Sequence, residues 1–394
     1  MGKNTFKPAD RLSLVQEYYF SRKLKEVARL NAEGLDIISL AIGSPDMPPS
    51  ERTIDVLCEE ARKAGGHGYQ PTIGTPELRT AMAAFYQRWY GVTLDPATEI
   101  QPLIGSKEGI LHVTLALVNP GDQVLVPNPG YPTYTALSRL LGADVVNYDL
   151  TEATGWQPDF EQLEAMDLSR VKLMWTNYPH MPTGARAQRK TYEALVRFAQ
   201  RHGIVIVNDN PYSFILNDGE RLSILQVDGA KDCCIEFNSM SKSHNMPGWR
   251  VGMLATNAEF IRWILKVKTN IDSGTFRALQ LAAAEALTHS TDDWHREMNV
   301  ATYARRRTIA EQIMTALGCT FDPTQTGMFL WGRIPETIAN VEDLTERVLH
   351  EARVFIAPGF IFGSNGERYI RISLCAKEDK MLEALARIRK TMTA

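Results

Sequence analysis

Short apolar runs recur along the middle of the chain and are separated by longer amphipathic stretches. The apolar runs cover residues 123–126, 171–175, 204–207, 233–237 and 251–255. Between them lie stretches with helical spacing, such as residues 191–202, which Gly203 ends. Alternating strands and helices predict an α/β fold, with a mostly parallel sheet sandwiched between helices. Loops after the strands of such a sheet gather at one edge, where ligands bind.

The last third of the chain changes character. Helical spacing at residues 260–268, 280–289 and 295–317 is followed by short β-rich pieces at 328–331, near Val354 and at 369–374. Residues 305–307, three arginines, are predicted on the polar side of the longest helix. This pattern predicts a smaller α+β domain. We expect an N-terminal segment, 1–45, that joins the small domain, a large domain over 46–285, and the small domain over 286–394.

Charge and composition exclude several classes of partner. The 394 residues carry a formal net charge of only −3 and contain no long run of Lys or Arg, so neither nucleic acid nor an anionic membrane is expected as a partner. The N-terminus has no secretory h-region, and the apolar runs are too short to span a bilayer, so the cytoplasm is the expected location. Five cysteines without metal-ligand spacing predict buried, reduced thiols and no metal site.

The strongest chemical signal is the segment 238–252, Asn-Ser-Met-Ser-Lys-Ser-His-Asn-Met-Pro-Gly-Trp-Arg-Val-Gly, which follows a predicted strand. Lys242 would lie just beyond the strand end, where burial lowers an amine pKa and lets lysine act as nucleophile and base. Ser239, Ser241 and Arg250 bracket it with two hydroxyls and a guanidinium, which suit a phosphate dianion. A lone Ser-x-Ser-Lys would equally fit a surface turn, but the whole segment favours a cofactor site.

This segment resembles the cofactor-lysine motif of the class I/II aminotransferases, the fold-type-I pyridoxal-phosphate enzymes with the aspartate-aminotransferase fold. The resemblance extends over nearly the whole chain, through several segments in the family's order. It implies pyridoxal 5'-phosphate as the cofactor, held by Lys242 as a Schiff base, the internal aldimine. It also implies that Ser239, Ser241 and Arg250 lie near the cofactor phosphate.

A second segment supports the same cofactor. The apolar run from residue 204 ends at Asp209, and Tyr212 follows three residues later. In the family, a carboxylate in this Asp-x-x-Tyr spacing keeps the pyridine nitrogen protonated, which makes the ring an electron sink, and the phenol contacts the ring hydroxyl. Asn-Asp-Asn-Pro alone would read as a turn. With Lys242 downstream, the cofactor interpretation is favoured.

Further positions match the family's cofactor site. Residues 104–109, Ile-Gly-Ser-Lys-Glu-Gly, precede a helix-like stretch, and the resemblance implies that Gly105, Ser106 and Lys107 hold the phosphate. On local evidence alone, a simple helix N-cap is an equal reading. The resemblance also implies that Tyr131 stacks on the pyridine ring. Tyr69 is similar to the tyrosine that reaches the phosphate of the neighbouring subunit, which implies a homodimer with shared active sites.

The substrate-binding residues are expected elsewhere in the chain. Arg371 lies in a strand-like run after the loop 357–363, and a bidentate guanidinium suits an α-carboxylate. Gly43 resembles the glycine that lies beside that carboxylate. The family usually carries Asn-Pro-Thr-Gly where this chain has Met181-Pro-Thr-Gly. A thioether is only a weak acceptor, so Asn177 or His180 would have to replace the missing amide.

The resemblance implies transfer of an amino group between an L-amino acid and a 2-oxo acid through pyridoxamine phosphate, a transaminase reaction. Three segments, residues 105–109, 270–274 and the N-terminal stretch 18–23, are most similar to the alanine and LL-diaminopimelate aminotransferases. Two alternatives remain open at this point. One is a pyridoxal-phosphate β-lyase, a C–S lyase on the same fold, which differs in the fate of the carbanion. The other is a non-catalytic regulator that senses the cofactor, although such proteins usually carry a fused DNA-binding domain and little chain precedes Leu40.

Overall fold

A seven-stranded sheet forms the centre of the larger part of the molecule. The computed structural model describes residues 6–17 and 19–392. The strand order is β2-β8-β7-β6-β5-β3-β4. The strands span Ile100–Leu103 (β2), Gly252–Ala255 (β8), Cys234–Ser239 (β7), Val205–Asp209 (β6), Val171–Thr176 (β5), Gln123–Asn128 (β3) and Asp144–Asp149 (β4). Only β8 runs antiparallel to its neighbours, β2 and β7. The predicted α/β fold with a mostly parallel sheet is confirmed.

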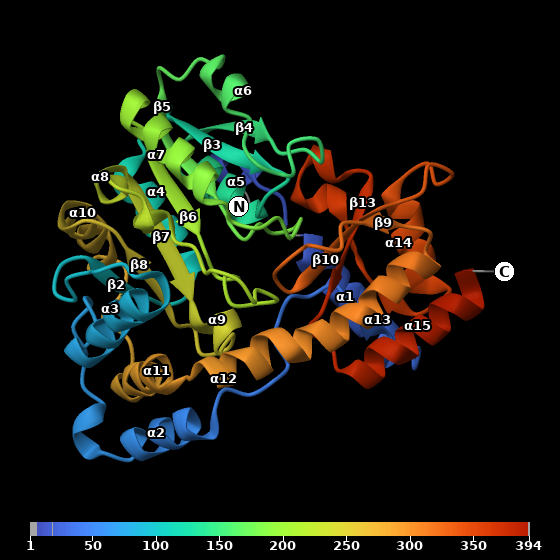
Figure 1. Ribbon diagram of the computed structural model, residues 1–394, viewed down its shortest axis with the longest axis horizontal. Helices are drawn as coiled ribbons and strands as arrows, with labels where there is room; N and C mark the ends of the chain where they lie inside the picture. Colours follow the sequence, from blue (N-terminus) through green and yellow to red (C-terminus); the bar gives the residue numbers. More distant parts are fainter. Residues whose placement is uncertain (1–5, 18, 393–394) are drawn as a thin grey trace, which may run out of the picture.

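Helices cover both faces of this sheet, as Figure 1 shows. The helices of this part are α3 (Pro76–Tyr90), α4 (Ser106–Leu117), α5 (Pro132–Leu140), α6 (Phe160–Glu164), α7 (Arg189–His202), α8 (Ala230–Cys233), α10 (Ala258–Lys268) and α11 (Arg277–His289). Helix α2 (Glu51–Ala61) packs against α11 and lies away from the sheet. Every residue of β7 is buried, as expected for a strand covered on both faces. Helix α7 ends at Gly203, whose φ of 66° is left-handed, so glycine stops the helix as predicted. Among the described residues, no helix is long and apolar enough to cross a membrane.

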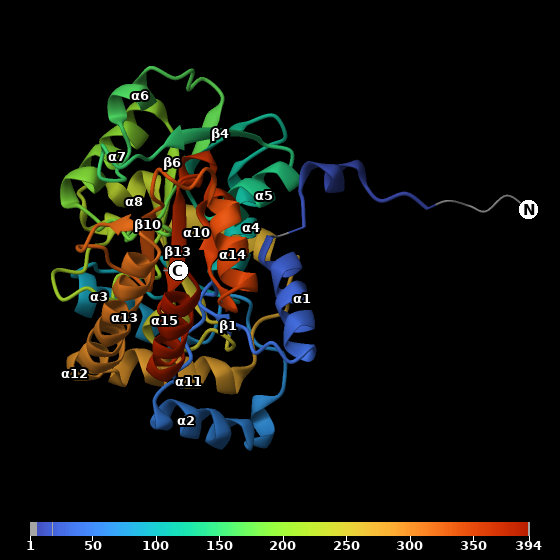
Figure 2. The same cartoon turned by 90° about the vertical axis from the view of Figure 1, so that its right-hand side faces the viewer.

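The C-terminal elements form a smaller unit around a second sheet, of order β12-β13-β10-β9. Its elements are β9 (Thr320–Phe321), β10 (Phe329–Arg333), α14 (Val341–His350), β11 (Val354–Phe355), β12 (Ala357–Pro358), β13 (Tyr369–Ser373) and α15 (Glu378–Met392). The N-terminal part joins this unit. Strand β1 (Ile38–Ser39) pairs in parallel with β11, and α1 (Tyr19–Ala32) packs into the same apolar core. Ahead of α1, the 3-10 turn Asp10–Leu14 lies beside α5, and residues 6–9 extend away from the body (Figure 2).

A long helical segment connects the two parts along the lower side of Figure 1, and it differs from the single helix predicted over residues 295–317. It consists of α12 (Asp292–His295), a π-helical turn (Arg296–Ala301) and α13 (Thr302–Ala316). The backbone carbonyl of Asn299, within the π turn, accepts a hydrogen bond from Leu216 N at 2.9 Å. That tertiary contact engages the backbone of the π turn, and the apolar spacing of the sequence does not reveal it.

The prediction that all three arginines of 305–307 lie on a polar face is wrong for Arg306. Its side chain is buried, and its guanidinium donates to both carboxylate oxygens of Asp46, at 2.7 and 3.0 Å. A buried guanidinium is tolerated because this bidentate ion pair compensates it. Asp46 lies 260 residues earlier in the chain. Local periodicity therefore gave no sign of the pair.

The expectation of buried thiols is also partly wrong. Cys58 is exposed on α2 and Cys233 is partly exposed, whereas Cys234, Cys319 and Cys375 are buried. Cys233 ends α8 and Cys234 begins β7, so the two thiols do not alternate across one strand. Their sulfur atoms lie 3.8 Å apart.

Candidate active site

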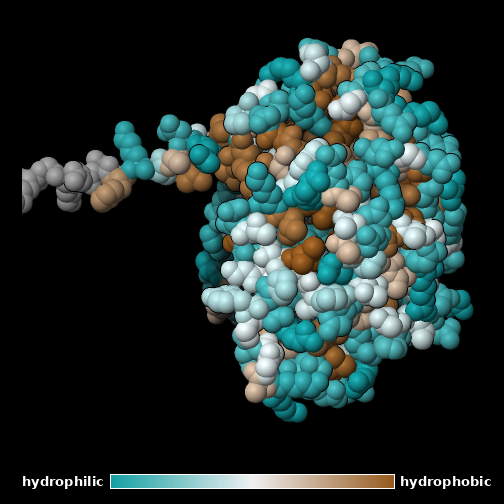
Figure 3. Space-filling view, turned by 90° about the vertical axis from the view of Figure 1, so that its left-hand side faces the viewer, coloured by the Kyte–Doolittle hydropathy of each residue, from teal (hydrophilic) through white to brown (hydrophobic). Residues whose placement is uncertain are grey.

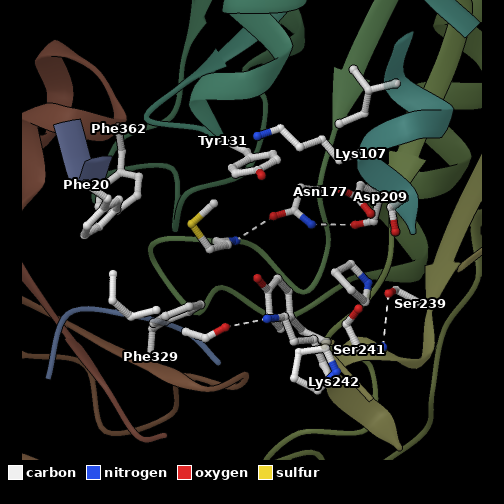
Figure 4. Close-up of a pocket in the computed structure, with 18 of the residues that line it drawn as sticks. Phe20, Lys107, Tyr131, Asn177, Asp209, Ser239, Ser241, Lys242, Phe329 and Phe362 are labelled. Atoms are coloured by element: carbon white, nitrogen blue, oxygen red, sulfur yellow. Dashed lines mark hydrogen bonds between the residues drawn. The ribbon is translucent and has the colours of Figure 1, made fainter. Parts of the chain in front are cut away.

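A cavity of about 860 Å³ lies where the C-terminal ends of β5, β6 and β7 face the smaller unit. That volume is within the range of small-molecule sites. The sheet side contributes Ser106, Lys107, Asp209, Ser239, Lys242 and Arg250. The smaller unit contributes Phe329, Phe362 and Arg371. Figure 4 shows the two sets on opposite sides, with Asp209 and Ser239 facing Phe20 and Phe362 across the cavity. Residues that were predicted from distant segments are thus brought together.

Lys242 reaches the cavity from a short helix, α9 (Met240–Ser243), that follows β7 directly. Ser239 caps this helix, because its hydroxyl accepts a hydrogen bond from Ser241 N at 3.2 Å. The Lys242 ammonium donates to the carbonyl oxygen of Gly43. Burial disfavours the charged form and lowers the pKa of Lys242. The amine is therefore held where it can act as a nucleophile.

Asp209 ends β6, the strand next to β7. Its Oδ2 accepts a hydrogen bond from the Tyr134 hydroxyl at 2.9 Å, and its Oδ1 is buried without a partner among the described residues. Burial raises the pKa of Asp209 to about 6, although Tyr134 and the charge of Lys242 oppose the rise. A buried oxygen without a partner at the cavity wall marks a position for a donor from a ligand.

Tyr134 is a site residue that sequence reasoning missed. It lies in the first turn of α5, three residues after Tyr131, which caps this helix. Both line the cavity, with ring centroids 5.5 Å apart. The i, i+3 spacing after the Pro-Gly-Tyr turn was the only available signal.

The N-terminus of α4 forms an anion cradle. Gly105 caps this helix with a φ of 74°, and Ser106 and Lys107 begin it. A Cβ atom on Gly105 would lie 2.1 Å from Nη2 of Arg250, so only glycine lets the guanidinium approach the loop. Ser106, Lys107, Ser239, Ser241 and Arg250 all line this part of the cavity. Backbone N–H groups, hydroxyls and cations in one place suit a phosphate.

Two predicted tyrosines lie in the cavity and one does not. Tyr131 and Tyr212 line it, and burial raises the pKa of both phenols, so both are protonated at neutral pH. The Tyr212 ring meets the Phe329 ring edge-on at 5.9 Å. Tyr69 is 93% exposed and lies outside the cavity of its own protomer.

Arg371 projects from β13 into an aromatic setting. Its guanidinium carbon lies 3.9 Å from the centroid of the Phe329 ring and 4.5 Å from that of Phe362. Nη2 donates to the carbonyl oxygen of Ala41 at 2.7 Å. A Cβ on Gly43 would lie 2.2 Å from the Phe329 ring, so a glycine at this position lets the ring approach the backbone. The rings stabilise the guanidinium through cation–π contacts and keep it in a partly desolvated setting.

The position of the missing amide is occupied by a thioether. Met181 is buried, and its Sδ accepts a hydrogen bond from Arg371 Nη1 at 3.3 Å. Asn177 lines the cavity, but its Oδ1 accepts from Met181 N at 2.8 Å and its Nδ2 donates to the carbonyl oxygen of Asp209. His180 pairs with Thr183 and does not line the cavity, so it does not replace the amide.

Comparisons with known proteins agree with this geometry. Residues 35–388 match the family described as aminotransferase class I and II. The chain is 39% identical over 383 residues to an LL-diaminopimelate aminotransferase of Dehalococcoides mccartyi, covering 97% of this chain and 98% of that protein.

Two solved structures show the same fold along nearly the whole chain. An apo structure of BacF from Bacillus subtilis superimposes with a TM-score of 0.92 at 36% identity, covering 98% of each chain. A mutant aspartate aminotransferase of Thermus thermophilus superimposes with a TM-score of 0.90 at 27% identity, covering 98% of this chain and 100% of that one. The aspartate-aminotransferase fold is confirmed, and the chain belongs to the class I and II aminotransferases and is a transaminase.

Proposed function

We propose that this transaminase uses pyridoxal 5'-phosphate to move an amino group between an L-amino acid and a 2-oxo acid. The observation that carries the proposal is a single cavity with three matched features: the Lys242 amine, the unpartnered Asp209 Oδ1, and the anion cradle at Gly105 and Arg250. These fit an aldehyde, a basic ring nitrogen and a phosphate. When bound, this cofactor supplies an aldehyde that condenses with amines and a ring that accepts electrons.

The lining residues would divide the work around this cofactor. Lys242 would supply both the nucleophilic amine and the base that removes the α-proton. Asp209, oriented by Tyr134, would hold a proton on the ring nitrogen. Tyr212 would donate to the ring hydroxyl, and Tyr131 would pack against the ring.

The remaining predicted residues bind the two anionic ends. Gly105, Ser106, Lys107, Ser239, Ser241 and Arg250 hold the phosphate. Arg371 binds the α-carboxylate of the substrate, with Gly43 and Asn177 beside it. The rings of Phe329 and Phe362 exclude water from the guanidinium that the carboxylate meets.

The two alternative functions are less well supported. The Dehalococcoides relative is an aminotransferase by name and covers nearly the whole chain, which does not favour a β-lyase. The same relative, named as an aminotransferase, does not favour a non-catalytic regulator either.

We also propose a homodimer in which Tyr69 enters the active site of the partner subunit. Tyr69, Ile271 and Phe276 are large apolar residues exposed on neighbouring loops. The loops touch, since a Cβ on Gly274 would lie 2.2 Å from the carbonyl oxygen of Gln70. Such a patch marks an interface. Apolar side chains also gather where the N-terminal arm leaves the body (Figure 3).

Two further proposals follow from the sequence and are consistent with this arrangement. One is a cytoplasmic location. The other is the division into an N-terminal segment of residues 1–45, a large cofactor-binding domain of 46–285 and a small domain of 286–394. The pairing of β1 with β11 supports the assignment of the N-terminal segment to the small domain.

The proposed chemistry has a direct test. An amino acid added to the holoenzyme should change the cofactor absorbance, and a 2-oxo acid should restore it. Release of ammonia and an oxo acid without an acceptor would support a lyase instead. Borohydride reduction followed by peptide mapping should leave the cofactor skeleton on Lys242; a label on another lysine would overturn the assignment.

A further inference from the structure

An apolar stripe of α1 lines the mouth of the cavity. Phe20, Leu24 and Ala28 recur every fourth residue, so they lie on one face of the helix, and all three line the cavity. Leu24 is 42% exposed although it lies on the face directed at the site. A partly exposed leucine on a cavity wall is the pattern expected where a ligand completes the burial.

The opposite walls of this outer region are apolar as well. Ile42, Phe329 and Phe362 line it, and the rings of Phe20 and Phe362 both lie near the Arg371 guanidinium, whose carbon is 5.6 and 4.5 Å from their centroids. The Phe20 ring also contacts the Phe355 ring, with centroids 6.4 Å apart, which holds it in place from behind. A substrate bound through its α-carboxylate at Arg371 would direct its side chain between these surfaces.

Among the described lining residues, Lys25 is the only charged group that has no task in the proposed function. Asp209 is the only carboxylate among the described lining residues, and it lies at the cofactor end. Of the lining cations, Lys107, Lys242, Arg250 and Arg371 have tasks in the proposed function. Lys25, the remaining one, binds Glu17 at 2.6 Å, and the Ser21 hydroxyl donates to the same carboxylate at 2.8 Å. The side chains of Lys25 and Glu17 are 71% and 47% exposed, so this ion pair lies at the solvent-facing rim of the cavity.

From these observations we infer that the preferred amino donor carries an extended apolar side chain, and that Leu24 and Phe20 select it. The inference rests on the proposed function, because it assumes that Arg371 binds the α-carboxylate. It separates this chain from the relative named for LL-diaminopimelate, a substrate with a second carboxylate and a second amine. Each added methylene buried between the apolar walls makes the binding free energy more favourable. A terminal charge would lose its hydration there without gaining a partner.

The test measures binding of unreactive acids that lack the amino group, by calorimetry with the holoenzyme. From butanoate to heptanoate, each methylene should tighten binding by about fourfold. Pimelate, which is diaminopimelate without its amines, should bind at least about tenfold more weakly than heptanoate. The zwitterion 6-aminohexanoate, with an ammonium group at its far end, should likewise bind more weakly than hexanoate. A flat series, or pimelate binding more tightly than heptanoate, would overturn the inference and indicate a charged subsite completed by the partner subunit.

Variants locate the subsite. Leu24→Ser should weaken the binding of heptanoate several-fold and leave the binding of butanoate unchanged, since only the longer chain reaches α1. Leu382→Ser is the matched control, because Leu382 is 53% exposed on α15 outside the cavity and should change neither acid. Equal weakening of both acids by Leu24→Ser would contradict the assignment. The proposed function is judged separately: if some amino acid converts the cofactor absorbance while the acid series is flat, transamination stands and only the side-chain inference fails.

Discussion

Arg371 donates a hydrogen bond from Nη1 to the thioether sulfur of Met181 at 3.3 Å, across 190 residues of sequence. The residue that stands in place of the family's asparagine is therefore in direct contact with the arginine proposed to bind the substrate. A thioether is a weak acceptor, so a carboxylate can displace it from the guanidinium at small cost. The departure from the family pattern therefore lies at the guanidinium that is proposed to meet the substrate carboxylate.

Replacing the thioether with an amide tests this relationship. Met181→Asn should tighten binding of the substrate carboxylate by about tenfold, because an amide N–H adds one hydrogen bond to a charged group. The same amide should lower the pKa of the cofactor chromophore, measured by absorbance titration. Met181→Leu is the control and should change little, since it removes only a weak acceptor. An unchanged chromophore pKa with weaker substrate binding would show that the pocket has repacked around Met181.

The raised pKa of Asp209 makes the cofactor-free protein sensitive to pH. Between its ordinary value of 3.8 and about 6, this carboxyl is ionised in the unfolded chain and protonated in the folded one. The folded state then binds more protons, so the contribution of Asp209 to stability falls as pH rises through this window.

The measurement is the unfolding free energy of the cofactor-free wild type minus that of Asp209→Asn. This difference should fall by up to about 3 kcal/mol from about pH 4 to about pH 7. Taking the difference removes the contribution of Glu236, another buried carboxyl, whose pKa is raised to about 7. A difference that does not change with pH would mean that Asp209 is not desolvated in the folded chain.

Tyr134 is expected to act through Asp209. Tyr134→Phe removes the hydrogen bond to Oδ2, so the pKa of Asp209 should rise further and turnover should fall by about tenfold at neutral pH. Because the carboxylate form is what turnover requires, part of the loss should be recovered at higher pH. Tyr148→Phe is the control: it deletes another buried hydroxyl, bonded to Trp175 O at 2.7 Å, and should lower stability without shifting the pH profile. Identical profiles for both variants would contradict the role of Tyr134.

The glycine at the anion cradle should not tolerate a methyl group. Gly105→Ala should weaken cofactor binding by tenfold or more, because the added Cβ would displace Arg250. Gly203→Ala is the matched control. Gly203 has a similar positive φ of 66° but nothing within 4 Å of the added Cβ, so it should lose some stability and keep its cofactor affinity. Equal cofactor affinity in the two variants would show that Arg250 does not take part in the cradle.

Sharing of active sites is tested by mixing two inactive forms. Lys242→Ala and Tyr69→Phe protomers should each show low activity alone. After unfolding and refolding together, roughly a quarter of the wild-type number of sites should be intact, because mixed dimers combine Lys242 of one chain with Tyr69 of the other. Light scattering should show a dimer throughout. No recovery of activity on mixing would place Tyr69 outside the catalytic unit.

Several features were predictable because they follow from chain-local rules. Asp209 and Lys242 each follow an apolar strand, and β6 and β7 are parallel neighbours, so their carboxyl ends meet at one edge of the sheet. The end of α7 was predictable because Gly203 directly follows the helical spacing of residues 191–202, and glycine readily adopts the left-handed backbone that ends a helix. The antiparallel direction of β8 was not predictable, since the apolar pattern of a buried strand is the same in either direction.

By itself, the sequence determined the alternation of strands and helices, because that depends on residues close together along the chain, and its resemblance to a family implied the roles of Lys242, Asp209 and Gly105. The tertiary structure alone decided the contacts of Tyr134 with Asp209, of Arg306 with Asp46 and of Met181 with Arg371, which join residues 75, 260 and 190 positions apart. It also decided that α1 lies over the cavity. Those contacts depend on how separate elements pack and on the direction of each side chain, and neither is encoded in the period of a single helix or strand.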